Sequence, residues 1–349
     1  MKTLTVLVAL LLAIQSNPSA AATAPSENSR APEGASQAAA TSRVVGAAKA
    51  FLAALSDAQR GKVSFAFDDN VQRAKWSNLP SGIYQRNGLR LGELNPAQRG
   101  SVMAILAAAL SPEGYAKVQG IMDADESLKQ SSRGGPAFGI DEFYISVLGE
   151  PSETTPWMLQ FGGHHLALNL TCAGGKGVLT PSLTAVQPSV FIRDGKSVRP
   201  LGAENDKAFA LINALDEAQR KQAILGAQMR DLVLGPGQDG RIIQPEGIKG
   251  SALTPKQKTM LLDLAAEWTG IIHQAAAQEK LKEIQANVDE TWFAWSGPTD
   301  PTQPAYFRVQ GPTLLIEYAP QKLGGDATKH IHTIYRDPTN DYGKKLLAR

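Results

Sequence analysis

Leu55-Ser-Asp-Ala-Gln-Arg60 is the first of four similar six-residue segments that are each predicted to start a helix. The others are Leu94-Asn-Pro-Ala-Gln-Arg99, Leu215-Asp-Glu-Ala-Gln-Arg220 and Leu253-Thr-Pro-Lys-Gln-Lys258. In each, a Ser, Asn, Asp or Thr can cap the helix, and a Gln three places later completes a capping box. The spacing from Gln59 to Gln98 nearly equals that from Gln219 to Gln257. This matched spacing predicts that the chain contains an internal repeat.

The segments that follow each pair of helix starts also recur. They are rich in aromatic and β-branched residues, as strands are, and the predicted strands are residues 144–149 and 157–170 in the first half and 292–297 and 306–318 in the second. A Gly-Gly pair and a third stretch follow in each half. We therefore expect an α+β fold in which two related helix–helix–β-meander halves, residues 44–190 and 191–349, pack about a pseudo-twofold axis. The alternative is a chance recurrence of favoured capping residues in an Ala-rich protein.

The N-terminal region predicts export. Residues 1–22 combine Lys2, an apolar stretch and Asn17-Pro-Ser-Ala-Ala-Ala22, which is the pattern of a secretory signal peptide. The Ala-, Ser- and Pro-rich residues 23–43 are typical of a disordered tether. The apolar stretch is too short to span a bilayer, so we expect a periplasmic or secreted protein with no membrane insertion after signal cleavage.

Charge and cysteine content exclude several classes of protein. The formal net charge is +2 and no basic run is present, so nothing predicts a nucleic-acid partner. The single cysteine, Cys172, excludes a disulfide framework within the chain and is expected to be incidental. The sequence has no Gly-x-Ser-x-Gly elbow and no glycine signature for a dinucleotide or phosphate loop.

Four of the five histidines fall on the predicted strands: His164, His165, His330 and His332. His330 and His332 are two positions apart, so their side chains should point the same way. The same alternation places His165 and Asn169 on one face with Glu317 of the other half. Imidazole and carboxylate groups are ligands of transition metals. We therefore predict that His165, His330, His332 and Glu317 bind Zn, Cu, Mn or Fe, whereas His273 is expected to be a packing or surface residue.

Other polar residues would contact a small-molecule substrate or ligand. His164, Asn169, Arg336 and Asp337 are predicted to surround the metal or to contact the substrate. Without a metal, Glu317 could act as a base and Arg336 could bind an anion.

The loop around Trp76 supports an alternative: a metal-free binding module for a small anionic or carbohydrate ligand. In a third interpretation, Trp76 packs on the core, the histidines form ordinary hydrogen bonds, and the protein is structural.

Several longer strings resemble a known family. They are Trp76-Ser-Asn-Leu-Pro, the Gly-Gly-His-His segment of residues 157–169, the His-x-His-x3-Arg-Asp segment of residues 330–337, and Asn340-Asp-Tyr-Gly343. Over roughly residues 42–349 the chain resembles the exported proteins grouped as "domain of unknown function 3500". Because that family has no established activity, the resemblance implies no reaction.

Overall fold

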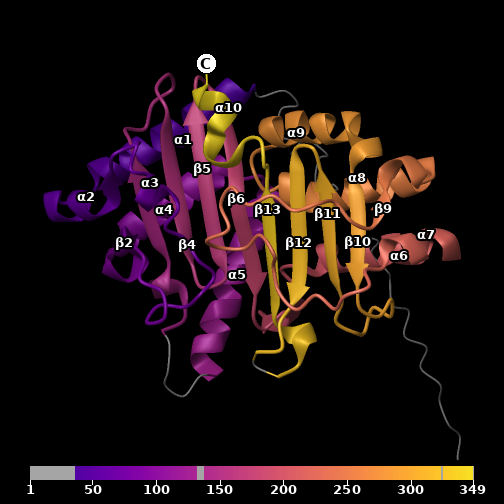
Figure 1. Ribbon diagram of the computed structural model, residues 1–349. Coiled ribbons are helices and arrows are strands. Elements are labelled where there is room, and N and C mark those ends of the chain that lie inside the picture. Colours follow the sequence, from indigo (N-terminus) through magenta and orange to yellow (C-terminus); the bar gives the residue numbers. More distant parts are fainter. Residues whose placement is uncertain (1–35, 132–136, 324, 349) are drawn as a thin grey trace, which may run out of the picture. The chain divides into compact units, whose positions relative to one another are not determined.

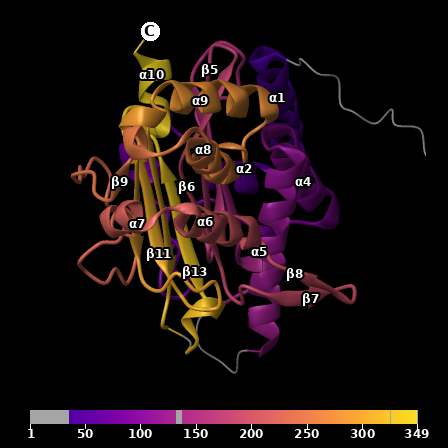
Figure 2. The same cartoon turned by 90° about the vertical axis from the view of Figure 1, so that its right-hand side faces the viewer.

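The computed structural model describes residues 36–131, 137–323 and 325–348. The predicted signal peptide and residues 23–35 of the predicted tether lie outside them. Residues Ala35–Arg349 form one compact unit. Within it, helices cover one face of a mixed sheet and long loops cover the other (Figures 1 and 2). The predicted α+β class is confirmed.

The described residues form an eleven-stranded sheet. Its strands are β1 (Ser64–Phe65), β2 (Leu89–Arg90), β3 (Tyr144–Leu148), β4 (Trp157–Gly163), β5 (Leu166–Ala173), β6 (Lys176–Val186), β9 (Ile248–Lys249), β10 (Trp292–Ser296), β11 (Tyr306–Gly311), β12 (Leu314–Pro320) and β13 (Ile331–Arg336). Their order is β1-β3-β4-β5-β6-β13-β12-β11-β10-β9, and β2 also pairs with β3. The pairing of β1 with β3 is parallel. At the centre β6 and β13 pair antiparallel, with Thr184 opposite Thr333, so strands from the two halves of the sequence form one sheet. A separate hairpin contains β7 (Phe191–Arg193) and β8 (Lys196–Val198).

The α-helices of the described residues are α1 (Gln37–Ala53), α2 (Asp57–Val63), α3 (Asn70–Arg73), α4 (Pro96–Ala109), α5 (Pro112–Ser131), α6 (Gly202–Ala214), α7 (Glu217–Ala223), α8 (Pro255–Thr269), α9 (Gln274–Ala286) and α10 (Lys344–Leu347). Four of them begin where the repeated capping pattern predicts. All four predicted capping boxes are formed, at the starts of α2, α4, α7 and α8. In the described residues no helix is both long and apolar enough to cross a membrane.

Each pair of capping boxes is joined through its glutamines. The side-chain amide of Gln98 donates to Oε1 of Gln59 at 3.0 Å, and that of Gln257 donates to Oε1 of Gln219 at 2.8 Å. The same Gln98 and Gln257 amide nitrogens also donate to the carbonyl oxygens of Ala54 and Ala214. The recurring spacing therefore has a physical reason, because each glutamine completes a helix cap and also fixes one helix start against the other.

Strand alternation divides the buried side chains between the two faces. On the helical face, Leu166, Leu168 and Leu170 pack with α1, α4 and α5, and Leu314, Ile316 and Tyr318 pack with α6 and α8. On the other face, Ala167 and Leu315 pack with Trp76 and Leu234 from the covering loops. The faces predicted for these alternating positions are thus confirmed.

The predicted boundaries of three segments are wrong. Residues 157–170 are not one strand but a hairpin of β4 and β5, and residues 306–318 likewise contain β11 and β12. Glycine at position 162 allows the returning strand β5 to approach closely. A Cβ atom there would lie only 2.4 Å from the carbonyl oxygen of Leu166. The predicted tether also ends too late, since α1 already begins at Gln37, capped by Ser36, and buries Ala40 and Val44.

Candidate metal centre

His164 and His165 are the two residues of the tight turn between β4 and β5, where Gly163 pairs with Leu166. His165 has a φ of 65°, a left-handed conformation that side-chain-bearing residues rarely adopt. Its backbone is held on both sides, because its N–H donates to the carbonyl of Asn78 and its carbonyl accepts from Ala185. The side chain of His165 is buried, at 2% exposure. The surrounding contacts therefore stabilise a strained backbone at a buried imidazole.

The beginning of strand β13 brings two further imidazoles to the same place. The β4–β5 turn and the start of β13 lie at the same end of the sheet (Figure 1). Between them is β6, on which Ala185 pairs with His332 and donates its N–H to His165. Because Ala185 carries only a methyl group, imidazoles from its two flanking segments can meet over it. His330 lies just before β13, and its ring centroid is 4.8 Å from those of both His165 and His332.

Nε2 of His330 faces the Nε2 atoms of both His165 and His332, and the ligand atoms of the three residues lie within 4.8 Å of one another. The Nε2 atoms of His165 and His330 are 3.0 Å apart, as are those of His330 and His332. Nitrogen ligands at about 2.1 Å from one metal ion, separated by angles of about 90–110°, lie about 3.0–3.4 Å from each other. The buried His165, His330 and His332 could therefore hold a metal ion.

The Nδ1 contact of His330 determines where the lone pair of its other ring nitrogen points. Nδ1 of His330 lies 2.8 Å from the carbonyl oxygen of Leu323, which can only accept, so Nδ1 carries the proton. Nδ1 of His332 faces Oδ1 of Asp231 at 3.3 Å. Metal-bound histidines usually donate their other nitrogen to a carbonyl or carboxylate in this way. Nε2 of His330 is therefore unprotonated, and its lone pair points into the cluster.

Burial keeps the rings of His165 and His330 neutral. Burial, followed by the charges of the neighbouring histidines, holds the pKa of His165 well below its ordinary value. Burial also lowers the pKa of His330 to about 4, partly offset by its hydrogen bond to Leu323. Neutral imidazole is the form that binds metals, so at neutral pH both side chains are in the ligand form.

A second polar pair supports the cluster from the side of α5. Nδ1 of His164 lies 2.5 Å from Oδ1 of Asp125, and both side chains are buried. The ring of His164 stacks on that of His165, with centroids 3.6 Å apart. Oδ2 of Asp125 accepts the N–H of Gly139. Asp125, His164 and His165 form a second group that could hold a metal ion.

The structure does not bring Glu317 to the imidazoles. Glu317 lies on the expected face of β12, but its oxygens accept the N–H groups of Val233 and Leu234 and the hydroxyl of Tyr306, at 2.6–2.9 Å. With its carboxylate occupied in this way, Glu317 fastens the covering loop to the sheet. Asn169 is likewise occupied, because it accepts from Gln160 and donates to the carbonyl of Pro181.

Arg336 and Asp337 lie at the opposite end of β13 from His332. A strand rises about 3.4 Å per residue, so His332 and Asp337, which are five positions apart, are separated by about 17 Å. Arg336 is buried, and its guanidinium binds the carboxylates of Asp239 and Asp341 and two backbone carbonyls. Asp337 is paired with Lys280. These contacts make both residues structural, so neither lies where the histidines could share a substrate with it.

Trp76, Cys172 and His273 pack within the protein. Trp76 is 6% exposed, contacts the loop-face core and donates its Nε1–H to the hydroxyl of Tyr342 at 2.7 Å. Burial raises the pKa of the Cys172 thiol to about 12, so it is protonated at neutral pH. His273 caps α9 by accepting the N–H of Ala276.

Three residues of the site were missed by the sequence analysis: Asp125, Asp231 and Asn78. Asp125 had a signal, because it occupies a position that continues the buried stripe of Val118, Ile121 and Met122 on α5. An acidic residue in such a stripe must find a partner, and here the partner is His164. Asp231 and Asn78 come from loops, and no local pattern marks them.

Comparisons with known proteins give a family without an activity. No curated protein matches the chain. No solved structure matches it either. A family model described as "Protein of unknown function (DUF3500)" matches residues 37–344, which include every histidine of the cluster. The chain therefore belongs to the DUF3500 family of proteins of unknown function.

Proposed function

We propose that this protein binds a divalent transition metal through Nε2 of His165, His330 and His332, and that it is an exported, metal-dependent enzyme acting on a small molecule. The observation that carries the proposal is the position of the His330 Nε2 atom. It has no proton to donate and lies 3.0 Å from two other imidazole nitrogens. A cation at the point where these atoms converge would satisfy all three.

Hydrogen bonds within the cluster account for this geometry less well. If His332 donates its Nδ1–H to Asp231, then its Nε2 and that of His330 are two lone pairs facing each other at 3.0 Å. Two lone pairs at that distance repel each other unless a proton or a metal ion lies between them. The low pKa of His330 disfavours the proton at neutral pH. A metal ion is therefore the better occupant.

The number of ligands favours catalysis over a structural role. Structural zinc sites have four protein ligands, whereas catalytic sites with three keep a position open for water or substrate. Three neutral imidazoles suit Zn, Cu, Mn or Fe and do not by themselves select one. The Asp125–His164 pair stacked on His165 would orient that ligand, and His164 could accept or donate a proton near it.

The pseudo-twofold arrangement and export belong to the same proposal. Two matched pairs of capping boxes and the central pairing of β6 with β13 support two related halves, with ligands contributed by both. Export is supported by the signal-like residues 1–22. Expression of the full sequence should yield a periplasmic protein whose N-terminus begins close to residue 23, and a cytoplasmic, uncut chain would contradict export.

Metal content tests the main proposal. The protein is purified without a polyhistidine tag and its metals are measured by mass spectrometry, beside a His330→Ala/His332→Ala double variant. His273→Asn serves as the matched control, because it removes a buried histidine outside the cluster and keeps a capping acceptor. We expect about one metal ion per chain in the wild type and the control, and none in the double variant.

Circular dichroism and urea unfolding establish that the double variant is folded. If the wild type holds no metal even after incubation with Zn, Cu, Mn and Fe, the proposal is wrong. Equal metal in the wild type and the double variant would also contradict it.

A further inference from the structure

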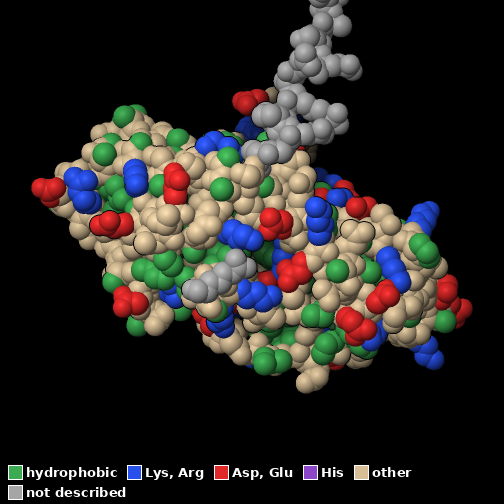
Figure 3. Space-filling model, turned by 90° about the horizontal axis from the view of Figure 1, so that it is seen from above, with side chains coloured by type: hydrophobic (Ala, Val, Ile, Leu, Met, Phe, Trp, Pro, Cys, Tyr) green, Lys and Arg blue, Asp and Glu red, His purple; other side chains and the backbone are tan. Residues whose placement is uncertain are grey.

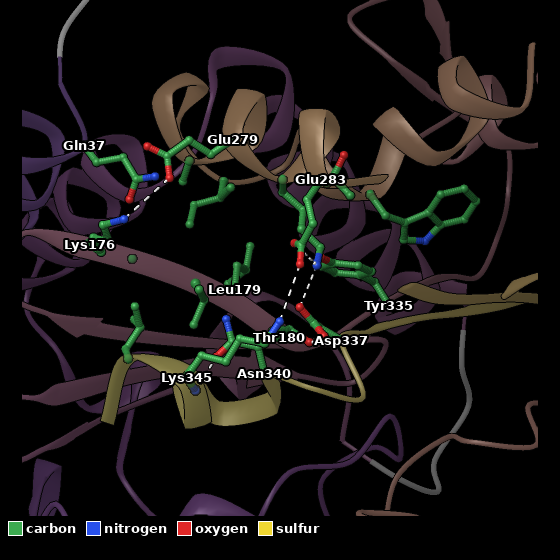
Figure 4. Close-up of a pocket in the computed structure, with 18 residues that line it drawn as sticks. Gln37, Lys176, Leu179, Thr180, Glu279, Glu283, Tyr335, Asp337, Asn340 and Lys345 are labelled. Carbon is green, nitrogen blue, oxygen red and sulfur yellow. Dashed lines mark hydrogen bonds and ion pairs between the residues drawn. The ribbon is translucent and has the colours of Figure 1, made fainter. Parts of the chain in front are cut away.

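A second candidate site lies at the other end of the central strands. A cavity of about 360 Å³ is bounded by α9, the start of β6, the end of β13 and the C-terminal residues (Figure 4). Its volume falls within the range of small-molecule sites, about 300–1,000 Å³. Much of its wall is apolar, with contributions from Leu179, Trp268, Ile272 and Ala276. The cavity is separate from the histidine cluster, since the cluster lies where β13 begins and the cavity where it ends.

The charged groups of this cavity neutralise one another. Figure 3, which looks onto this end of the molecule, shows basic and acidic side chains gathered around an opening. The six charged lining residues form these pairs: Lys176 with Glu279, Lys280 with Glu283 and Asp337, and Lys345 with Glu283. Lys280 holds both its partners closely, at 2.8 and 2.6 Å. Among the described residues, no lining residue therefore offers an uncompensated charge to a ligand.

One polar group that lines the cavity has no hydrogen-bond partner among the described residues. Tyr335 lines the cavity with 5% of its surface exposed, and its hydroxyl has no hydrogen-bond partner in the described part of the chain. By contrast, the nearby Trp268 donates its Nε1–H to Thr333. Burial and the neighbouring Asp337 raise the pKa of Tyr335 well above its ordinary value, so the hydroxyl keeps its proton as a donor. The hydroxyl is therefore available to donate a hydrogen bond to an acceptor on a ligand in the cavity.

We propose that this cavity binds an uncharged small molecule with an apolar or aromatic body and one hydroxyl or carbonyl oxygen, which accepts a hydrogen bond from Tyr335. The apolar wall would cover the body of the ligand. The mutually paired lysines and carboxylates select against charged ligands, because an ion would have to compete for their partners or be buried unpaired. The site does not depend on the metal proposal.

Four matched fluorinated probes test the chemistry by fluorine NMR on the full protein. They are para-fluorobenzyl alcohol, fluorobenzene, para-fluorobenzoate and para-fluorobenzylammonium, which share one ring and differ in the polar group. We expect the alcohol to bind tightest and the two ions to bind at least about tenfold more weakly. Failure of the alcohol to bind, or stronger binding of either ion, would overturn the proposal.

Variants place the binding in this cavity. Tyr335→Phe removes only the hydroxyl. It should therefore weaken the binding of the alcohol by about threefold to tenfold and leave the binding of fluorobenzene unchanged. Ala276→Phe should fill the cavity and abolish binding of both, and Val178→Phe replaces it if the first variant does not fold. If the probes still bind to the variant with the filled cavity, the site is elsewhere. If Tyr335→Phe does not change the affinity for the alcohol, the hydroxyl has no role.

Discussion

His165 holds a backbone conformation that costs free energy for any residue other than glycine. Its φ of 65° is maintained by hydrogen bonds to Asn78 and Ala185, and its imidazole stacks on His164. At the second position of such a turn glycine is the residue expected on stability grounds. A histidine there is consistent with selection for the side chain rather than for the turn, in line with the proposed metal centre.

Replacing His165 by glycine and by alanine distinguishes the effect of backbone strain from the effect of losing the side chain. Both His165→Gly and His165→Ala remove the proposed ligand, but only glycine relieves the left-handed strain. We therefore expect His165→Gly to be more stable than His165→Ala by about 1 kcal/mol. Urea unfolding of both variants in the presence of a metal chelator measures the difference. If the alanine variant is as stable as the glycine variant, the turn at this position is not strained.

At the scale of elements, α9 depends on a titratable cap. Nδ1 of His273 accepts the N–H of Ala276, which requires that nitrogen to be unprotonated. Burial, and then the charge of Arg43, lowers the pKa of His273 from 6.5 to about 4. Between these two values the unfolded chain binds a proton at this residue and the folded protein does not. The contribution to stability is therefore retained above pH 6.5 and is progressively lost as the pH falls toward 4.

An asparagine cap tests this dependence. His273→Asn keeps an acceptor at the start of α9 and removes the titration. We expect the free energy of unfolding to fall less steeply between about pH 6.5 and pH 4 in this variant than in the wild type. Urea unfolding across this range, with a metal chelator in both samples, gives the two slopes. The other buried histidines are present in both proteins, so identical slopes would exclude His273 as the source.

At the scale of the whole molecule, buried polar contacts join the two halves of the sequence. Thr184 of β6 and Thr333 of β13 are hydrogen-bonded at 2.8 Å across the centre of the sheet. Behind it, Lys117 of α5 is paired with Glu204 of α6, whose side chain is fully buried. Burial raises the pKa of Glu204, and Lys117 opposes this shift. An unpaired charge at this position would be costly.

Removing one partner of this pair should therefore destabilise the whole protein. We expect Lys117→Met to lower the free energy of unfolding by about 3–5 kcal/mol, because Glu204 then remains buried without its cation. The Lys117→Met/Glu204→Leu double variant should recover most of this loss. Urea unfolding of the two variants and the wild type measures both effects. A loss below about 1 kcal/mol in the single variant would show that Glu204 is neutralised in another way.

Local sequence determined the elements and part of the site. The four capping boxes specify helix starts because the hydrogen bonds of each box join residues three positions apart. All four boxes are formed. Alternation specified which face of a strand is apolar, as for Leu168 and Ala167. The same reasoning singled out His165, His330 and His332, because histidines are few and fall on predicted strands, although only His332 of the three lies within a strand of the structure. It failed where a turn interrupted the alternation, as it does at His164 and His165.

Only the tertiary structure decided which polar groups meet. Glu317 and His332 share a face of the sheet, but strand register and the covering loop assign the Glu317 carboxylate to backbone amides. Asp125 and Asp231 reach the histidines from a helix and a loop that are distant from them in the sequence. Helix caps and strand faces depend on neighbours within a few residues, whereas these contacts depend on how the whole chain folds. The sequence by itself therefore determined the helices and the candidate imidazoles, and long-range packing decided their partners and the second cavity.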